Sequence, residues 1–124
     1  MAVEIPTRNA VAVSAAAPRA ARIANFNDAL RRTFTGGRVM ISAGVSALPE
    51  EVRATLLAAV QDFDAFGADN NPYGERNFGI VEAAGTRCFW KIDVYDRELR
   101  GHSPDPADPA VTVRVLTVMR PEEY

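Results

Sequence analysis

Large apolar residues recur with a helical period in two segments of the chain, residues 20–34 and 49–63. In the first segment the apolar residues that share one helical face are Ile23, Phe26, Leu30 and Phe34. In the second segment they are Val52, Leu56, Val60 and Phe63. Gly36-Gly37 is a natural end for the first helix, and Pro49 suits the start of the second, where its missing N–H needs no partner. The pattern therefore predicts two amphipathic helices.

β-branched and alternating residues predict four strands after these helices are set aside. The first is short and covers residues 38–43. Residues 77–83 and 86–95 are joined by Ala84-Gly85, which indicates a hairpin. Residues 111–119 hold four valines and two threonines, so a strand is favoured over a helix capped by Asp108-Pro109.

Alternation within residues 86–95 predicts which side chains share a face of the sheet. One face carries Cys88, Trp90, Ile92 and Val94, which we expect in the core. The other face carries Phe89, Lys91, Asp93 and Tyr95, and its mixture of aromatic and charged groups is where a ligand or partner would be met.

The predicted element order is αβαβββ, which favours a two-layer α+β domain with an about four-stranded, mainly antiparallel sheet and both helices on one face. We expect this single domain to cover residues 20–124. Residues 1–19 have few large apolar groups and no sustained period, so we expect a flexible tail. Within that tail residues 10–18 imitate a short signal-peptide core, but an Ala-rich tail is the favoured interpretation.

Charge and cysteine content narrow the classes of function. The 124 residues include 14 basic and 16 acidic side chains, for a net charge of −2. This balance argues against binding dominated by phosphate neutralisation, so a nucleic-acid partner is disfavoured. One cysteine, Cys88, forms no internal disulfide or cysteine-cluster zinc site, and no apolar run reaches the ~20 residues of a membrane span. We therefore expect a cytoplasmic protein without a membrane partner.

The run from Lys91 to Pro109 is the richest in candidate chemistry, because it holds five carboxylates and the only histidine. One hypothesis makes Asp93 and His102, together with Glu75, an acid–base or metal site. The alternative is a solvated strand end and loop, in which Asp105 and Asp108 accept hydrogen bonds from nearby backbone amides. The run lacks an EF-hand or a paired-histidine spacing, so we expect no metal and no cofactor.

Two further groups of polar residues have both a functional and a structural interpretation. Residues 67–77 form an Asn/Asp-rich loop that could ligate a cation, but these residues are also typical of turns. Four arginines lie in or just after the first helix and could contact phosphates, although a solvated helix face is the simpler interpretation: Arg22, Arg31, Arg32 and Arg38.

Four segments in this order resemble a small bacterial family classified as a domain of unknown function: residues 26–39, 63–79, 89–96 and 103–117. The resemblance covers residues 22–124. It implies a cytoplasmic protein that is often encoded on plasmids and integrative elements, and it implies no particular activity. The family pattern usually reads Glu-His-Asp before Phe-Gly, whereas this chain has Glu75, Arg76 and Asn77. That departure weakens an enzyme interpretation.

The favoured function is a non-catalytic interaction or modulator protein of a mobile genetic element that binds a host, defence or plasmid protein. Its expected binding residues are Tyr73, Phe89, Lys91, Asp93 and Tyr95. The alternative is a small hydrolase that uses Asp93, His102 and Glu75, with or without a divalent metal. A homodimer formed by an exposed edge strand at residues 111–119 is a further possibility. The sequence leaves open the partner, the oligomeric state and whether the two polar loops form one site.

Overall fold

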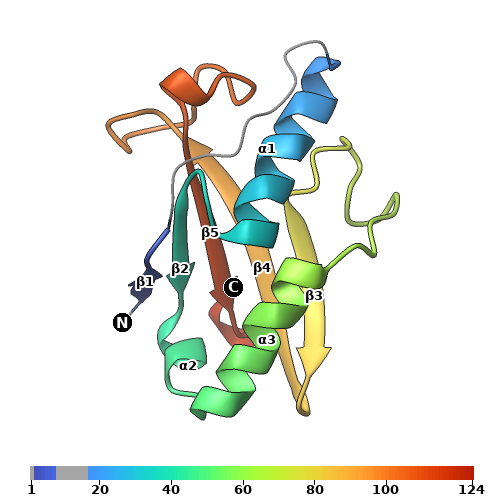
Figure 1. Ribbon diagram of the computed structural model, residues 1–124, viewed down its shortest axis with the longest axis vertical. Coiled ribbons are helices and arrows are strands. Elements are labelled where there is room, and N and C mark those ends of the chain that lie inside the picture. The colour runs from blue at the N-terminus through green and yellow to red at the C-terminus, as the bar shows by residue number, and fades with distance from the viewer. Residues whose placement is uncertain (1, 8–16) are drawn as a thin grey trace.

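The structure is a computed structural model that describes residues 2–7 and 17–124 (Figure 1). The stretch that imitates a signal-peptide core lies largely outside the described residues. The helices and strands, in chain order, are β1 (Val3–Ile5), α1 (Arg19–Thr33), β2 (Arg38–Ile41), α2 (Ala43–Ser46), α3 (Glu50–Asp62), β3 (Phe78–Ala83), β4 (Thr86–Tyr95) and β5 (Val113–Met119). Two short 3-10 helices, η1 (Pro109–Val111) and η2 (Pro121–Glu123), flank β5.

The five strands form one mixed sheet in the order β1-β2-β5-β4-β3. β2 pairs with β5 in parallel, and the other neighbouring pairs are antiparallel. The α+β class is therefore confirmed, but the four-stranded, mainly antiparallel sheet is corrected. The additional strand, β1, falls within the segment predicted as a flexible tail, where Val3 to Ile5 pair with Ile41 to Val39.

The expectation that residues 111–119 form an edge strand is wrong. β5 lies at the centre of the sheet, between β2 and β4, and the edges are β1 and β3. Both sides of β5 are therefore hydrogen-bonded within the chain, so β5 cannot pair with a second copy.

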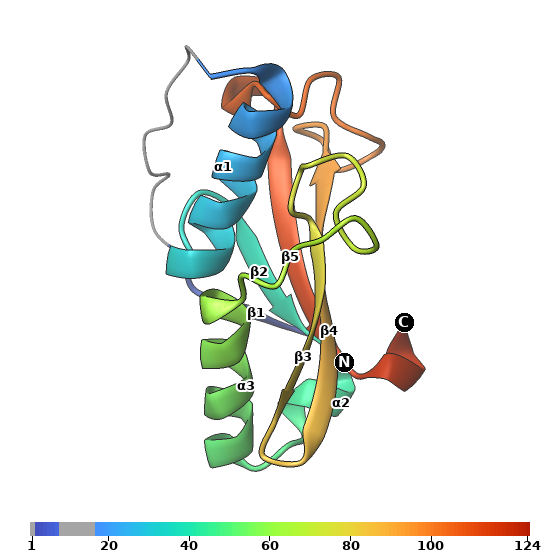
Figure 2. The same ribbon diagram turned by 90° about the vertical axis from the view of Figure 1, so that its right-hand side faces the viewer.

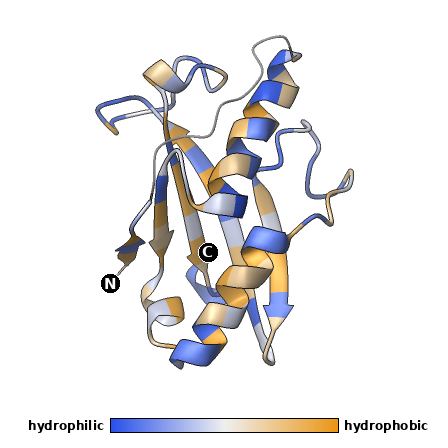
Figure 3. Cartoon of the chain, viewed as in Figure 1, coloured by the Kyte–Doolittle hydropathy of each residue, from blue (hydrophilic) through white to orange (hydrophobic). Residues whose placement is uncertain are grey.

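The long helices α1 and α3 lie on the same side of the sheet, and the 3-10 helix η2 lies on the other (Figure 2). The buried core forms between these helices and the sheet, and among its members are Leu30, Leu56, Val60, Trp90 and Leu116. Hydrophobic residues are concentrated in the strands and along α3, whereas the 96–101 loop is mostly hydrophilic (Figure 3). We call the helix-covered side of the sheet the inner face and the opposite side the outer face.

The local sequence explains how the main elements begin and end. α3 begins directly after Pro49, with Glu50 and Glu51 in its first turn. α1 ends at Thr33, and Phe34, which caps it, adopts a left-handed conformation (φ 52°) two residues before the predicted glycine stop. The β3–β4 hairpin turns through Ala84 and Gly85, both with positive φ, as a two-residue type I′ connection requires.

A buried guanidinium joins the two helices on the inner face. Arg31 of α1 is fully buried, and its Nη1 donates to the carbonyl oxygens of Val60 (3.1 Å), Gln61 (3.1 Å) and Phe63 (2.7 Å) at the end of α3. Its Nη2 pairs with Asp28 at 3.0 Å. Because a helix C-terminus carries unpaired carbonyls, this cation both satisfies them and fixes α1 against α3.

Candidate functional site

A cavity of about 590 Å³ lies at the end of β4, beside the 101–106 loop. This end of β4 is at the top of Figure 1. Four parts of the chain line it: residues 92–95 of β4, residues 101–104 and 106 of the following loop, Glu75 and Asn77, and Arg19. Asn27 of α1 helps to position this wall, because its Nδ2 donates to the carbonyl oxygen of Glu75 at 2.9 Å.

The cavity brings together the three residues predicted for acid–base chemistry. Glu75, Asp93 and His102 all contribute to its lining, and so does Tyr95. His102 is placed by a short antiparallel bridge to Tyr95, which puts these two residues side by side at the end of β4. The two polar loops therefore meet at this cavity through Glu75 and Asn77.

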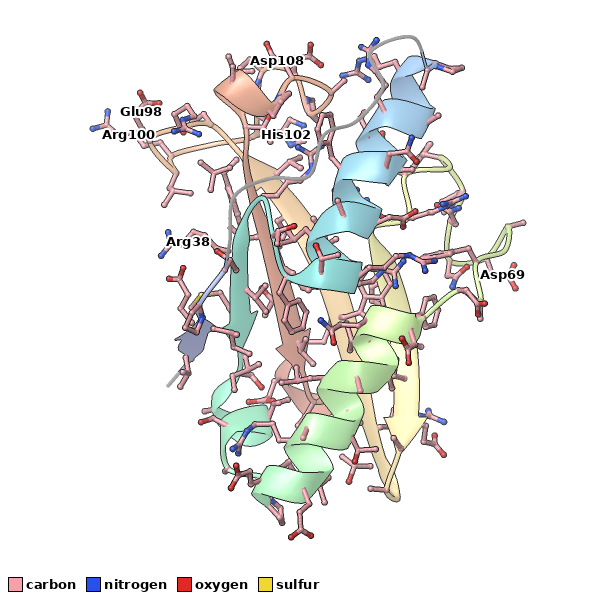
Figure 4. All side chains as sticks on the ribbon, in the orientation of Figure 1. Arg38, Asp69, Glu98, Arg100, His102 and Asp108 are labelled. Carbon is pink, nitrogen blue, oxygen red and sulfur yellow. The ribbon has the colours of Figure 1, made fainter. Side chains whose placement is uncertain are left out.

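Two asparagines of the 67–77 loop stabilise the loop itself. Asn70 Oδ1 accepts from the N–H of Gly67 at 2.8 Å, and Asn71 Oδ1 accepts from the N–H of Arg76 at 2.8 Å. Asp69 lies well away from His102 (Figure 4). These contacts support the turn interpretation of the Asn/Asp-rich segment.

Three carboxylates of the run from Lys91 to Pro109 hold backbone turns. Asp96 Oδ1 accepts from the N–H groups of Glu98 and Arg100, both at 3.0 Å. Asp105 Oδ1 accepts from the N–H of Ala107 at 3.1 Å, and Asp108 Oδ1 accepts from the N–H of Ala110 at 2.9 Å. Asp105 and Asp108 thus have the loop-shaping role predicted from their place before proline.

Asp93 forms an ion pair with Lys91, the adjacent residue on the same face of β4. Lys91 Nζ lies 2.9 Å from Asp93 Oδ2, and this hydrogen bond raises the pKa of Lys91 above its usual value. Within the described residues, no group of three or more His, Cys, Asp or Glu side chains is placed to hold a metal ion. The cavity thus combines acidic, basic and amide groups without a metal-ligand set.

Sequence reasoning missed a buried cation beside the cavity. Arg114 of β5 is 3% exposed, and burial lowers its pKa to about 10. Its Nε donates to Asn27 Oδ1 at 2.9 Å and its Nη2 donates to the carbonyl oxygen of Pro106, a residue of the cavity wall. The available signal was one charged residue at an inward-facing position of a β-branched strand.

The outer face of the sheet carries a cluster of three aromatic rings. Phe78 of β3, Phe89 of β4 and the C-terminal residue Tyr124 pack edge to face, with ring centroids 5.6–6.2 Å apart. Tyr124 is 74% exposed, and Ile80, next along this face of β3, is 45% exposed. We call Phe78, Phe89 and Tyr124 the aromatic cluster.

A second, smaller hollow of about 320 Å³ lies on the outer face. Its lining is mainly apolar and consists of Met40, Tyr95, Leu99 and Val115, together with Arg38. The guanidinium of Arg38 is held by Glu4 of β1, with Nη2 to Oε1 at 2.8 Å. Tyr95 lines both this hollow and the larger cavity, so the two are neighbours.

The structure places the predicted binding residues in two regions. Phe89, Lys91 and Tyr95 follow the outer face of β4 together with Asp93, as alternation predicts. Tyr73 is instead 80% exposed in the 67–77 loop. Cys88 is buried on the inner face, where burial raises the pKa of its thiol and makes it a poor nucleophile.

Comparison with known proteins gives one match. The sequence pattern of a family described as "Protein of unknown function (DUF3768)" matches residues 41–123. The matched span includes three of the four segments that carry the resemblance, and residues 26–39 precede it. No curated protein and no solved structure matches the chain. Among the described residues there is no helix long and apolar enough to span a membrane.

Proposed function

The chain belongs to the DUF3768 family, and we propose that it is a non-catalytic interaction protein that binds a partner protein on the outer face of its sheet. The observation that carries the proposal is the aromatic cluster. Three rings in mutual contact lie on the outer face of the sheet, as the burial patterns of β3 and β4 show for Phe78 and Phe89. Tyr124 is exposed and Phe78 and Phe89 are partly buried, and aromatic side chains gathered in this way at a surface are typical of interface hot spots.

The charges on the outer face indicate the chemistry of the partner. Three ion pairs of this face each join one basic and one acidic side chain: Glu4 with Arg38, Glu82 with Arg87 and Lys91 with Asp93. Such a surface attracts no strongly charged partner, and the neighbouring hollow offers an apolar lining. The partner is therefore a protein that contributes an apolar side chain to the hollow and an uncharged surface to the aromatic cluster.

The resemblance described above gives the proposal its biological setting. Proteins of that kind are often encoded on plasmids and integrative elements of bacteria, so the proposed partner is a host, defence or plasmid protein in the cytoplasm. A modulator of this type needs a recognition surface and no catalytic set, which agrees with the structural roles of Asp96, Asp105 and Asp108.

Paired variants test the proposal. Tagged full-length chain captures partners from a lysate of its bacterial host, and the captured partner is then purified for affinity measurements. Phe89→Ser and Leu99→Asp each remove one part of the outer face, whereas Ala58→Ser changes an exposed position on α3. We expect each outer-face variant to weaken binding at least about tenfold, as for a hot spot, and Ala58→Ser to leave it unchanged. Equal affinity for all three variants would contradict the proposal.

A second candidate function is a small hydrolase, because Glu75, Asp93 and His102 line one cavity. Its test is turnover of a panel of ester and phosphoester substrates, with and without Mg²⁺ or Mn²⁺. The interaction proposal predicts no turnover above a heat-inactivated sample. Turnover that disappears in His102→Asn and persists in Phe89→Ser would instead establish the hydrolase.

A further inference from the structure

The edge of β4 that faces away from β5 is covered by two separate partners. β3 covers the lower part, from Phe78 opposite Lys91 to Ala83 opposite Thr86. Beyond β3, Asn77 still pairs once with β4, because its carbonyl oxygen accepts from the N–H of Ile92 at 2.8 Å. At the far end, the N–H of Ser103 donates to the carbonyl oxygen of Val94 at 3.1 Å. A gap separates these two contacts.

The alternation of backbone groups shows what faces this gap. In a strand, the N–H and C=O of one residue point to the same side. Since the N–H of Ile92 and the C=O of Val94 point away from β5, the C=O of Ile92 and the N–H of Val94 do so too. Within the described part of the chain, neither of these two groups has a hydrogen-bond partner.

The unpaired groups border the larger cavity. Ile92, Val94, Asn77 and Ser103 are all among its lining residues. Its volume of about 590 Å³ lies in the range of sites that hold small ligands or short peptides. Strand groups left without a partner at such a site are a template for another extended chain.

We propose that this gap is a recognition slot for a short extended peptide segment of the partner protein. The segment accepts a hydrogen bond from the N–H of Val94 and donates one to the C=O of Ile92, as an added strand does. This inference rests on the proposed function, because it assumes that the segment belongs to a protein partner. The inference also names the place where the main chain of the partner is bound, which the aromatic cluster does not determine.

The length of the gap limits the segment. β4 offers the stretch from Ile92 to Val94, which spans ~7 Å at about 3.3 Å per residue, before Asn77 and Ser103 close it on either side. One residue of the segment pairs fully in this space, and its neighbours must turn out of the sheet. The slot therefore takes a chain end or the apex of a loop, and excludes a long added strand.

Two proline substitutions test the assignment of the backbone groups. Proline lacks an N–H, so Val94→Pro removes the unpaired donor without removing a hydrogen bond of the sheet. Asp93→Pro is the matched control, because the N–H of Asp93 points toward Val115 of β5. We expect Val94→Pro to remain folded and Asp93→Pro to lose the fold, as measured by circular dichroism.

The probe for binding is a phage-displayed library of random heptapeptides, panned against the full-length protein. We expect enriched peptides whose affinity falls about tenfold or more in Val94→Pro, the cost of one lost hydrogen bond, and is unchanged in Phe89→Ser. Absence of enriched peptides, or equal affinity for Val94→Pro and the wild type, would overturn the slot. Loss in Phe89→Ser alone would also overturn it while leaving the proposed function intact.

Amide hydrogen exchange gives a second measurement that needs no substitution. In the free protein the amide of Val94 should exchange faster than those of Asp93 and Tyr95, which face β5. Saturation with an enriched peptide should slow the Val94 amide about tenfold or more. An amide of Val94 that is already as protected as its neighbours, or one that the peptide leaves unprotected, would refute the slot.

Discussion

The two faces of the sheet use the same residue types in opposite ways. On the inner face the cations Arg31 and Arg114 are buried and donate hydrogen bonds to backbone carbonyls and to Asp28 or Asn27. On the outer face the cations Arg38 and Lys91 are partly exposed and pair with one carboxylate each. Charge on the inner face therefore supports the fold, while these charges on the outer face are balanced in pairs, as the proposed function requires of a neutral binding surface.

Aromatic residues show the same division within one strand. Trp90 is fully buried against Phe63 and Phe66, with ring centroids 5.5 and 6.1 Å away. Its neighbour Phe89 packs on the outer face against Phe78 and Tyr124. Adjacent positions of β4 thus place one aromatic ring in the core and the next in the aromatic cluster of the outer face.

The largest expected effect comes from replacing Trp90. Trp90→Ala leaves a cavity in the core and should lower the free energy of unfolding by about 4 kcal/mol. Phe89→Ala is the control one residue away, and should cost about 1 kcal/mol because it removes only the edge-to-face contacts on the outer face. Urea denaturation measures both values. Similar losses for the two variants would contradict the division between the faces.

The next effect is the removal of the buried cation of α1. Arg31→Met should lower the free energy of unfolding by about 3 kcal/mol, since three carbonyls at the end of α3 lose their donor. Arg32→Met, at the neighbouring exposed position, should change it by less than about 0.5 kcal/mol. A loss below about 1 kcal/mol for Arg31→Met would mean that the guanidinium is not what holds the helices together.

A smaller effect is expected at the point where β3 meets the core. A Cβ on Gly79 would lie 2.4 Å from Trp90 Nε1 and 2.8 Å from Phe63 Cζ, so Gly79→Ala forces these rings to move. The expected cost is about 2 kcal/mol, seen as a lower melting temperature. Gly67→Ala is the control, because a Cβ there meets no atom within 4 Å. An unchanged melting temperature for Gly79→Ala would show that β3 packs less closely than described.

The smallest effect concerns the acidic end of the chain, outside the core. Glu123 accepts hydrogen bonds from Ser42 Oγ at 2.6 Å and from the N–H groups of Gly44 and Arg120, and the first of these contributes most to lowering its pKa. A carboxyl whose pKa is lower in the folded state stabilises the fold above its ordinary pKa of 4.5 and loses this contribution as the pH falls through the folded value.

Wild type should therefore be slightly more stable than Glu123→Gln at pH 7, by less than about 1 kcal/mol because the group is exposed. The difference should shrink as the pH falls below 4.5. Thermal unfolding of both proteins across this range measures it. A difference that grows on acidification would have the wrong sign for this linkage.

The sequence predicted those parts of the fold whose local signals are strong. The helical period of the apolar residues predicted both long helices, and Ala84-Gly85 predicted the hairpin. β1 was missed because Val3 to Ile5 carry no pattern of their own and become a strand only by pairing with β2. The central place of β5 was missed because alternation shows which residues share a face, but not which strand lies beside another.

For the candidate site, too, the sequence predicted the features that depend on local pattern and missed those that depend on tertiary structure. Alternation placed Phe89, Lys91, Asp93 and Tyr95 on one face, and the proline context gave Asp105 and Asp108 their turn-holding role. The sequence could not predict the gap at Ile92 and Val94 where we propose the slot. This gap depends on where Asn77 and Ser103 stop pairing with β4, and tertiary structure alone determines that.

The most direct test of the central claim is site-specific photo-crosslinking in the cells that naturally make the protein. A benzophenone amino acid replaces Phe89 on the outer face or Ala58 on the exposed side of α3. We predict one major cross-linked partner from position 89, and none at comparable yield from position 58. Equal yields from the two positions, or cross-links only from position 58, would contradict the assignment of the outer face as the recognition surface.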